Sequence, residues 1–215
     1  MKLYFISGLG ADRRAFYKIQ LPASYEPVYL DWIKPLANES LADYARRFSA
    51  AIRSDEDFII VGLSFGGILA SELAKIVSPR KVIIISSLGS SKEQPWYFRL
   101  AAKFGLHRLI SPAVYKQATL IHRVMGAGSN ETKAIVYDYV RKADPEFIRW
   151  SLNAIVNWQH EERVNNLIHI HGSRDQLLPI RYVKADYIIR NGEHLMVMNR
   201  ADEVNKILSE VLEPA

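Results

Sequence analysis

Three short segments carry the residue types of a serine nucleophile, an acid and a base. They are Gly62-Leu63-Ser64-Phe65-Gly66-Gly67, His171-Gly172-Ser173-Arg174-Asp175 and Asn191-Gly192-Glu193-His194. A serine hydroxyl is a weak nucleophile at its ordinary pKa, so it needs a base to take its proton and an acid to orient that base. Ser64, Asp175 and His194 supply these groups in a chain order found in such triads. The pattern predicts nucleophilic attack by Ser64 on an acyl carbon.

The surroundings of Ser64 make its motif more specific than the spacing Gly-x-Ser-x-Gly alone. An apolar run, 58–61, precedes the motif, and a segment with helical spacing, 68–74, follows it. This is the strand–turn–helix setting of a nucleophile elbow, in which a strained turn lifts the hydroxyl above a sheet. Glycines at 62 and 66 remove Cβ atoms that would collide across that turn. The following helix N-terminus directs backbone N–H groups toward charge that develops beside Ser64.

The predicted acid and base also follow apolar runs. Asp175 comes after the run 167–171, and His194 comes after the run 187–190 and before the last helical segment. Because carboxyl ends of parallel strands open on one rim, these loops converge there. His171 is the main rival base, but its place at a strand end, like that of His169 within the strand, favours a buried structural histidine. The remaining histidines, which have no acid at matching spacing, are His107, His122 and His160.

Hydrolysis of an acyl bond also needs donors for the developing oxyanion. The first predicted donor is the backbone N–H of Phe65, directly after the nucleophile. The second is the N–H of Leu9 in Ser7-Gly8-Leu9-Gly10, a loop after the first apolar run. Each such donor typically stabilises the transition state by about 3 kcal/mol. A phosphate-binding loop is the alternative, but the lysine of the Gly-x-x-x-x-Gly-Lys pattern is absent.

The elements that must position these residues alternate along the chain. Short, continuously apolar runs, which suit parallel strands covered on both faces, occupy 3–6, 27–31, 58–61, 82–85, 167–171 and 187–190. Segments with one apolar stripe at helical spacing occupy 41–52, 68–77 and 204–212. This alternation predicts a three-layer α/β/α fold around a mostly parallel sheet.

Residues 92–160 break the alternation. They contain no strand-like run, and helices are predicted at 95–104, 111–124, 131–142 and 145–159, with breaker and cap signals at Gly126-Ala127-Gly128-Ser129 and Asp144-Pro145. We interpret 92–160 as a helical cap inserted into one discontinuous core, 1–91 and 161–215. The candidates to line a substrate pocket are Trp96, Phe98, Trp150 and Trp158. Such aromatics more often pack a lobe against its core.

Composition limits the other classes of function. The 215 residues include no cysteine, which excludes disulfide scaffolds, thiolate catalysis and zinc–sulfur sites. No apolar stretch is long enough to span a membrane, and the N-terminal run is shorter than a signal peptide requires, so a cytoplasmic location is expected. The net charge of +5 lies within residues 92–160, which hold 10 Lys and Arg against 5 Asp and Glu. This excess is either a solvated face or an attraction for an anionic substrate, to which Arg13 and Arg14 would add; it matches no nucleic-acid motif.

The motif at 62–67, together with Asp175 and His194, resembles the α/β-hydrolase superfamily, especially its small esterase-like and thioesterase-like members. The resemblance covers 1–91 and 161–215. It implies Ser64 as nucleophile, Asp175 as acid, His194 as base, Leu9 and Phe65 as the oxyanion hole, and 92–160 as the cap. The usual His-Gly of the oxyanion loop is Ser7-Gly8 here. The first strand corresponds to the third strand of the family, which implies about six strands.

The sequence therefore predicts a serine hydrolase that cleaves a carboxylic ester or thioester of a small acyl substrate. It needs neither metal nor organic cofactor. Two alternatives stay open. The same triad can serve C–C bond hydrolysis, acyl transfer or lyase chemistry, because one fold hosts many reactions. A non-catalytic binding protein that retains the pocket is the other.

Overall fold

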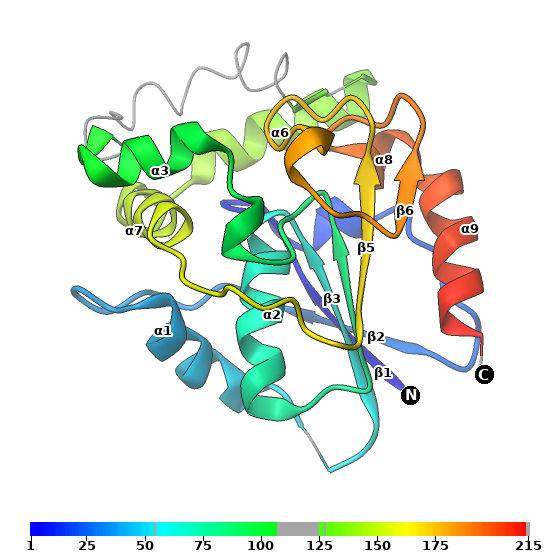
Figure 1. The fold of residues 1–215 in the computed structure, drawn as a ribbon. Helices are drawn as coiled ribbons and strands as arrows, with labels where there is room; N and C mark the ends of the chain where they lie inside the picture. Colours follow the sequence, from blue (N-terminus) through cyan, green and yellow to red (C-terminus); the bar gives the residue numbers. More distant parts are fainter. Residues whose placement is uncertain (54, 107–124, 127, 214–215) are drawn as a thin grey trace.

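The computed structural model describes residues 1–53, 55–106, 125–126 and 128–213. In these residues the chain forms one sheet of six parallel strands, in the order β2-β1-β3-β4-β5-β6 (Figure 1). The strands are β1 (Lys2–Ile6), β2 (Glu26–Leu30), β3 (Phe58–Leu63), β4 (Lys81–Ile85), β5 (Leu167–Gly172) and β6 (Tyr187–Ile189). The predicted parallel sheet of about six strands is confirmed.

Both faces of the sheet are covered, which explains the continuously apolar strands. Successive side chains point to opposite faces of a strand. Along β1, Leu3 and Phe5 therefore enter the core on one face, while Tyr4 and Ile6 enter the core on the other. All four are at most 2% exposed. Removing such side chains from water supplies the main free energy that holds the layers together.

The helices form the two outer layers. α1 (Leu41–Phe48) and α2 (Phe65–Val77) pack on one face, and α8 (Met196–Asn199) and α9 (Ala201–Leu212) pack on the other (Figure 1). The predicted helix over 41–52 ends earlier, because the chain tightens into a 3₁₀ turn at Ser49–Ala51. The predicted helix over 68–77 begins earlier, at Phe65, because the chain turns directly from the strand end into the helix.

Between β4 and β5 the chain contains α3 (Trp96–Lys103), α6 (Asn130–Lys142) and α7 (Pro145–Val156), close to three of the predicted helices. The cap signals act as predicted: Ser129 Oγ accepts a hydrogen bond from the Thr132 N–H, and the Asp144 carboxylate accepts one from the Glu146 N–H. The predicted helix over 111–124 lies outside the described residues.

The end of the sheet toward which the strand arrows point carries the predicted site. Figure 1 shows α3, α6 and α7 at this end. Because every strand of the described sheet is parallel, the loops after β1, β3, β5 and β6 all leave from this carboxyl edge. Segments far apart in the sequence thus meet there, such as those of Ser64 and His194, which are 130 positions apart.

Candidate active site

Ser64 occupies a strained turn between β3 and α2. Its backbone has φ 53° and ψ −119°, a sparsely populated region that costs about 1–3 kcal/mol for a non-glycine residue. A Cβ at Gly62 would collide with the Gly66 carbonyl, and a Cβ at Gly66 would collide with the carbonyls of Ile6 and Ser7. Both glycines are therefore required by close approach, as predicted. The turn is held by the Ser64 N–H, which donates to the Ile85 carbonyl at 2.9 Å.

A continuous hydrogen-bonded path joins Ser64 to His194 and Asp175. His194 Nε2 lies 2.9 Å from Ser64 Oγ, and His194 Nδ1 lies 2.7 Å from Asp175 Oδ2. The carboxylate only accepts, so Nδ1 carries the proton and Nε2 accepts the hydroxyl of Ser64. His194 is fully buried and Asp175 is 4% exposed, whereas Ser64 is half-buried. The Ser64 hydroxyl thus lies at the more exposed end of this path, while its two partners are shielded from water.

The Asp175 carboxylate is held in its ionised form. Burial raises the pKa of Asp175, but the His194 ring and a backbone hydrogen bond from Leu178 outweigh burial, and the pKa lies below its ordinary value. Asp175 Oδ1 accepts from the N–H groups of Leu177 and Leu178 at 2.9 and 2.8 Å. Asp175 Oδ2 is left to face His194. The loop therefore fixes both the charge and the direction of the carboxylate.

His171, the rival base of the sequence prediction, has both ring nitrogens in contact with groups other than Ser64. Its Nε2 donates to the Leu178 carbonyl at 2.8 Å and lies 3.7 Å from Asp175 Oδ2. Its Nδ1 is 3.1 Å from Nε2 of His169. Burial lowers the pKa of both histidines, so the pair is neutral. Both are buried, hydrogen-bonded histidines of the kind that the sequence favoured.

The backbone segments predicted to form the oxyanion hole flank Ser64. A Cβ added at Gly8 would lie 3.5 Å from Ser64 Cβ, so the loop after β1 runs against Ser64. Phe65 is the first residue of α2 and is 1% exposed. Leu9, in the same loop as Gly8, packs partly buried against the core on the α2 side of the sheet.

The four predicted pocket aromatics lie in different surroundings. Phe98 and Trp150 are partly buried, and Trp150 lies edge-on to Phe65 with ring centroids 5.9 Å apart. Trp96 is 56% exposed. Trp158 is 5% exposed, and its indole N–H donates to Glu72 of α2 at 2.8 Å. Trp158 therefore packs the chain after α7 against α2, the more common role for such an aromatic.

Two residues have partners that their spacing in the sequence did not indicate. His160 does have an acid partner, because its Nδ1 lies 2.9 Å from Glu72 Oε1, although 88 positions separate the two residues. Arg14 is paired as well. Its guanidinium bonds to both Asp12 and Asp138, and Arg141 and Lys142 also form ion pairs with Asp138. His107 and His122 lie outside the described residues.

A groove of about 1210 Å³ runs between residues 34–42, which lead into α1, and α7. Trp150, Trp158 and Glu72 line it, whereas Ser64, Asp175 and His194 do not. The groove is therefore distinct from the Ser64 site. Among the described residues, no cluster of side chains could hold a metal ion, and no helix is long and apolar enough to cross a membrane.

Three residues around the site were missed by sequence reasoning. The Ser87 hydroxyl donates to the Ser64 carbonyl at 2.6 Å, and the Tyr97 hydroxyl donates to the Leu177 carbonyl in the Asp175 loop at 3.3 Å. The Trp32 indole N–H contacts the loop after β1. Ser87 and Trp32 each follow the carboxyl end of a strand, so the rule that found Asp175 could have pointed to them. Tyr97, on α3, gave no such signal.

Several solved structures share this fold. An esterase from Exiguobacterium antarcticum has a TM-score of 0.73 at 12% sequence identity, covering 97% of this chain and 90% of that chain. An esterase from Thermogutta terrifontis has a TM-score of 0.71 at 15% identity, covering 99% and 89%. A bromoperoxidase from Bacillus anthracis has a TM-score of 0.69 at 15% identity, covering 99% and 92%. At such low identities the likeness concerns the fold.

The comparison with curated protein sequences found no match. The comparison with family sequence patterns did find one: the alpha/beta hydrolase family matches residues 3–207, nearly the whole chain. This span includes the Ser64 elbow, the Asp175 loop and the His194 loop. The chain therefore belongs to the alpha/beta hydrolase family.

Proposed function

We propose that this protein is a serine hydrolase that cleaves a carboxylic ester or thioester through an acyl-enzyme. The observation that carries the proposal is the path Ser64 Oγ–His194 Nε2 at 2.9 Å and His194 Nδ1–Asp175 Oδ2 at 2.7 Å. Both distances are within hydrogen-bonding reach of a nucleophile, its base and an orienting acid. The strained turn at Ser64 holds its half-buried hydroxyl at the end of this path.

In the proposed reaction, His194 Nε2 takes the proton of Ser64 as Oγ attacks the acyl carbon. The carbonyl π bond opens, and the N–H groups of Leu9 and Phe65 receive the resulting oxyanion. The imidazolium then protonates the leaving alkoxide or thiolate as its bond to the acyl carbon breaks. Water, deprotonated by His194, releases the acid in the same way, and ionised Asp175 stabilises the imidazolium in both halves.

We propose further that residues 92–160 form a cap that shapes the acyl pocket. Two contacts bring this segment to the catalytic edge. Tyr97 of α3 donates to the Leu177 carbonyl, and Asp138 of α6 bonds to Arg14 behind the loop that contains Leu9. Phe98 and Trp150, both partly buried, are the predicted pocket aromatics that we retain; Trp150 lines the groove beside α7 and also lies edge-on to Phe65, next to Ser64. The substrates in this proposal are small acyl compounds.

Replacing the nucleophile tests the mechanism. For Ser64→Ala, we expect kcat for short p-nitrophenyl esters to fall by about 10⁴-fold or more, because removing the nucleophile disables the whole triad. A fluorophosphonate probe labels wild type at Ser64 and leaves Ser64→Ala unlabelled. Ser71→Ala is the matched control. This buried serine on α2 donates to the Gly67 carbonyl at 3.2 Å within its own helix, so turnover and labelling should persist.

Turnover or labelling that survives in Ser64→Ala would contradict the proposal. A wild-type protein that neither turns over esters nor takes the probe would instead match the alternative of a binding protein. A panel of esters, thioesters and lactones over several acyl lengths then resolves the substrate class.

A further inference from the structure

Trp32 contacts both backbone segments of the proposed oxyanion hole. It lies two residues beyond β2, and Gly8 lies two residues beyond β1. The last registered pair of these strands is Ile6 with Leu30, so the parallel register brings Trp32 level with Gly8. The indole N–H donates to Ser7 Oγ at 3.1 Å and to the Gly8 carbonyl at 3.2 Å. One side chain thus reaches from the edge strand to the loop beside the nucleophile.

The Gly8 carbonyl matters because it shares a peptide group with the Leu9 N–H. A trans peptide is planar, and its C=O and N–H bonds point to opposite sides. The Gly8 oxygen accepts from Trp32 and also from the Ala11 N–H, at 3.0 Å. Two donors therefore fix the carbonyl, and the same planar group fixes the direction of the Leu9 N–H.

Ser7 extends the same support. It is 3% exposed, accepts from the Trp32 indole, and donates through its own hydroxyl to the Ala11 carbonyl at 2.7 Å. Ser7 stands where the family usually has histidine. Here the Trp32–Ser7–Ala11 chain closes the loop onto itself, so the loop holds its shape without a histidine.

The face of the same indole packs on Phe65, whose N–H is the second proposed donor. The two rings are stacked, with centroids 5.2 Å apart and planes inclined by 14°. Phe147 of α7 lies against the indole as well, at 5.2 Å, and Phe48 of α1 at 6.1 Å. Rings from three helices therefore surround the indole, while its N–H reaches the loop after β1.

We propose that Trp32 is a positioning residue that sets the geometry between the Leu9 and Phe65 N–H groups. Its N–H holds one donor peptide, and its ring holds the residue that supplies the other. The inference rests on the proposed serine-hydrolase function. An oxyanion exists only after attack, so loss of this positioning lowers kcat and leaves substrate binding nearly unchanged.

The test separates the indole N–H from the indole ring. Trp32→Phe keeps an aromatic ring on Phe65 and removes the donor; incorporation of 3-benzothienylalanine at position 32 keeps the whole bicyclic shape and replaces the N–H by sulfur. In both proteins we expect kcat for a p-nitrophenyl ester to fall by about 10-fold or more, less than the 10²–10³-fold typical when an oxyanion donor itself is removed. We expect KM to stay within about twofold and the affinity for a boronic acid transition-state analogue to fall in parallel with kcat.

Tyr4→Phe is the control for lost stability. Tyr4 lies on β1 and is 2% exposed, and its hydroxyl bonds to the backbone of Arg53 at the opposite end of the sheet. This variant should lower the melting temperature without changing kcat. If the benzothienylalanine protein keeps wild-type kcat and boronic acid affinity, the positioning role is wrong. If Trp32→Phe fails to fold, the benzothienylalanine protein alone decides.

Failure of the proposed function gives a different result. A wild-type protein that hydrolyses no ester and takes no fluorophosphonate has no triad chemistry to position. An active, labelled wild type with an unaffected benzothienylalanine protein overturns only the role of Trp32.

Discussion

Two buried histidine–carboxylate pairs lie in different regions of this molecule. At the carboxyl edge of the sheet, Asp175 lies 2.7 Å from His194. Where the two ends of the 92–160 segment meet α2, Glu72 lies 2.9 Å from His160. We call this second place, formed by Ser91, His160 and Glu72, the neck. All four residues are at most 6% exposed. Distance and burial are therefore nearly equal, and the surroundings of each pair must account for any difference in role.

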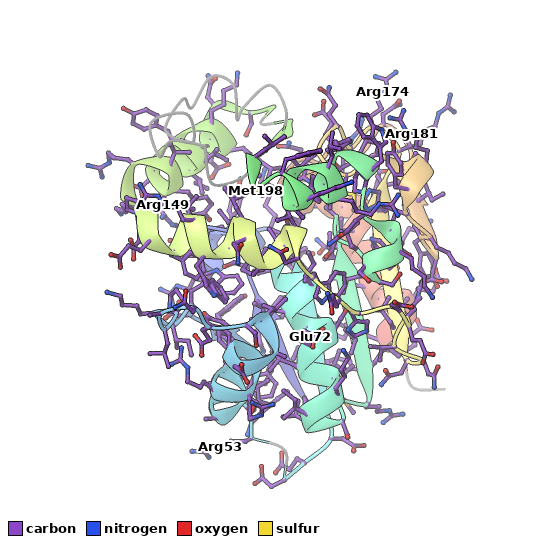
Figure 2. The ribbon with its side chains drawn as sticks, turned by 60° about the vertical axis from the view of Figure 1, so that its left-hand side comes forward. Arg53, Glu72, Arg149, Arg174, Arg181 and Met198 are labelled. Carbon is purple, nitrogen blue, oxygen red and sulfur yellow. The ribbon has the colours of Figure 1, made fainter. Side chains whose placement is uncertain are left out.

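The pair at the neck connects chain segments. Glu72 also accepts from the Trp158 indole and from Lys75, and the backbone of His160 exchanges hydrogen bonds with Ser91. The two ends of the 92–160 segment are thus tied to each other and to α2, where Glu72 lies beneath α7 in the view of Figure 2.

The pair at the carboxyl edge has a different neighbour. The second ring nitrogen of His194 meets Ser64, a half-buried hydroxyl on a strained turn. A histidine–carboxylate pair by itself therefore indicates only a stable buried contact. A nucleophile at the far ring nitrogen gives the pair its proposed chemistry.

Replacing the histidine of each pair should show most clearly that the two pairs have different roles. For His194→Gln, we expect kcat for p-nitrophenyl esters to fall by about 10⁴-fold or more, because no base remains for Ser64. For His160→Gln, we expect kcat to stay within a few-fold and the melting temperature to fall. Steady-state kinetics and thermal unfolding of the two variants measure both effects. Equal losses of kcat would show that the neck also takes part in the reaction.

Removing the charge at the neck should affect stability. Glu72→Gln replaces a buried carboxylate that receives hydrogen bonds from Trp158 and His160, and we expect the free energy of unfolding to fall by about 1–3 kcal/mol. Urea unfolding measures this change. Lys75→Met is the control, since the Lys75 side chain is 49% exposed and its bond should contribute less. A larger loss in Lys75→Met would mean that the indole and imidazole contacts are not the important ones.

A smaller effect distinguishes Glu72 from Glu93, another buried carboxylate near the neck. Burial raises the pKa of Glu72, but bonds from His160 and Trp158 outweigh it, and the pKa lies below the ordinary 4.5. Burial also raises the pKa of Glu93; backbone bonds from Gly89 and Lys184 do not offset it, and the pKa lies above 4.5. Acidification should therefore change the contributions of the two carboxylates to the free energy of unfolding in opposite directions.

The stabilisation from Glu72 is complete above pH 4.5 and is lost as pH falls through its lowered native pKa. The ionisation of Glu93 acts oppositely: stability falls as pH rises from 4.5 through its raised native pKa. In a plot of the free energy of unfolding against pH, Glu72→Gln should therefore lose less stability than wild type as the solution is acidified. The free energy of unfolding of Glu93→Gln should increase relative to that of wild type as pH rises. Parallel curves for wild type and both variants would contradict these assignments.

Much of the fold and of the candidate site followed from local spacing. The strands were recognisable because burial on both faces requires continuous apolar runs, and Ser129 and Asp144 marked helix starts because each caps its own first turn. Ser64 was recognisable for the same local reason, since Gly62 and Gly66 are needed within a few residues of it. Asp175 and His194 required one further step, the rule that parallel strands end on one edge.

The sequence by itself determined which residues stand at strand ends, because periodicity and turn chemistry act over a few neighbouring positions. Only the tertiary structure decided which of these residues meet. His160 contacts Glu72, 88 positions away, and Arg14 bonds to Asp138, 124 positions away. The Trp32 indole bonds to Gly8 because of the register of two strands. These contacts depend on how layers pack and strands align. That information is spread over the whole chain, so no short motif contains it.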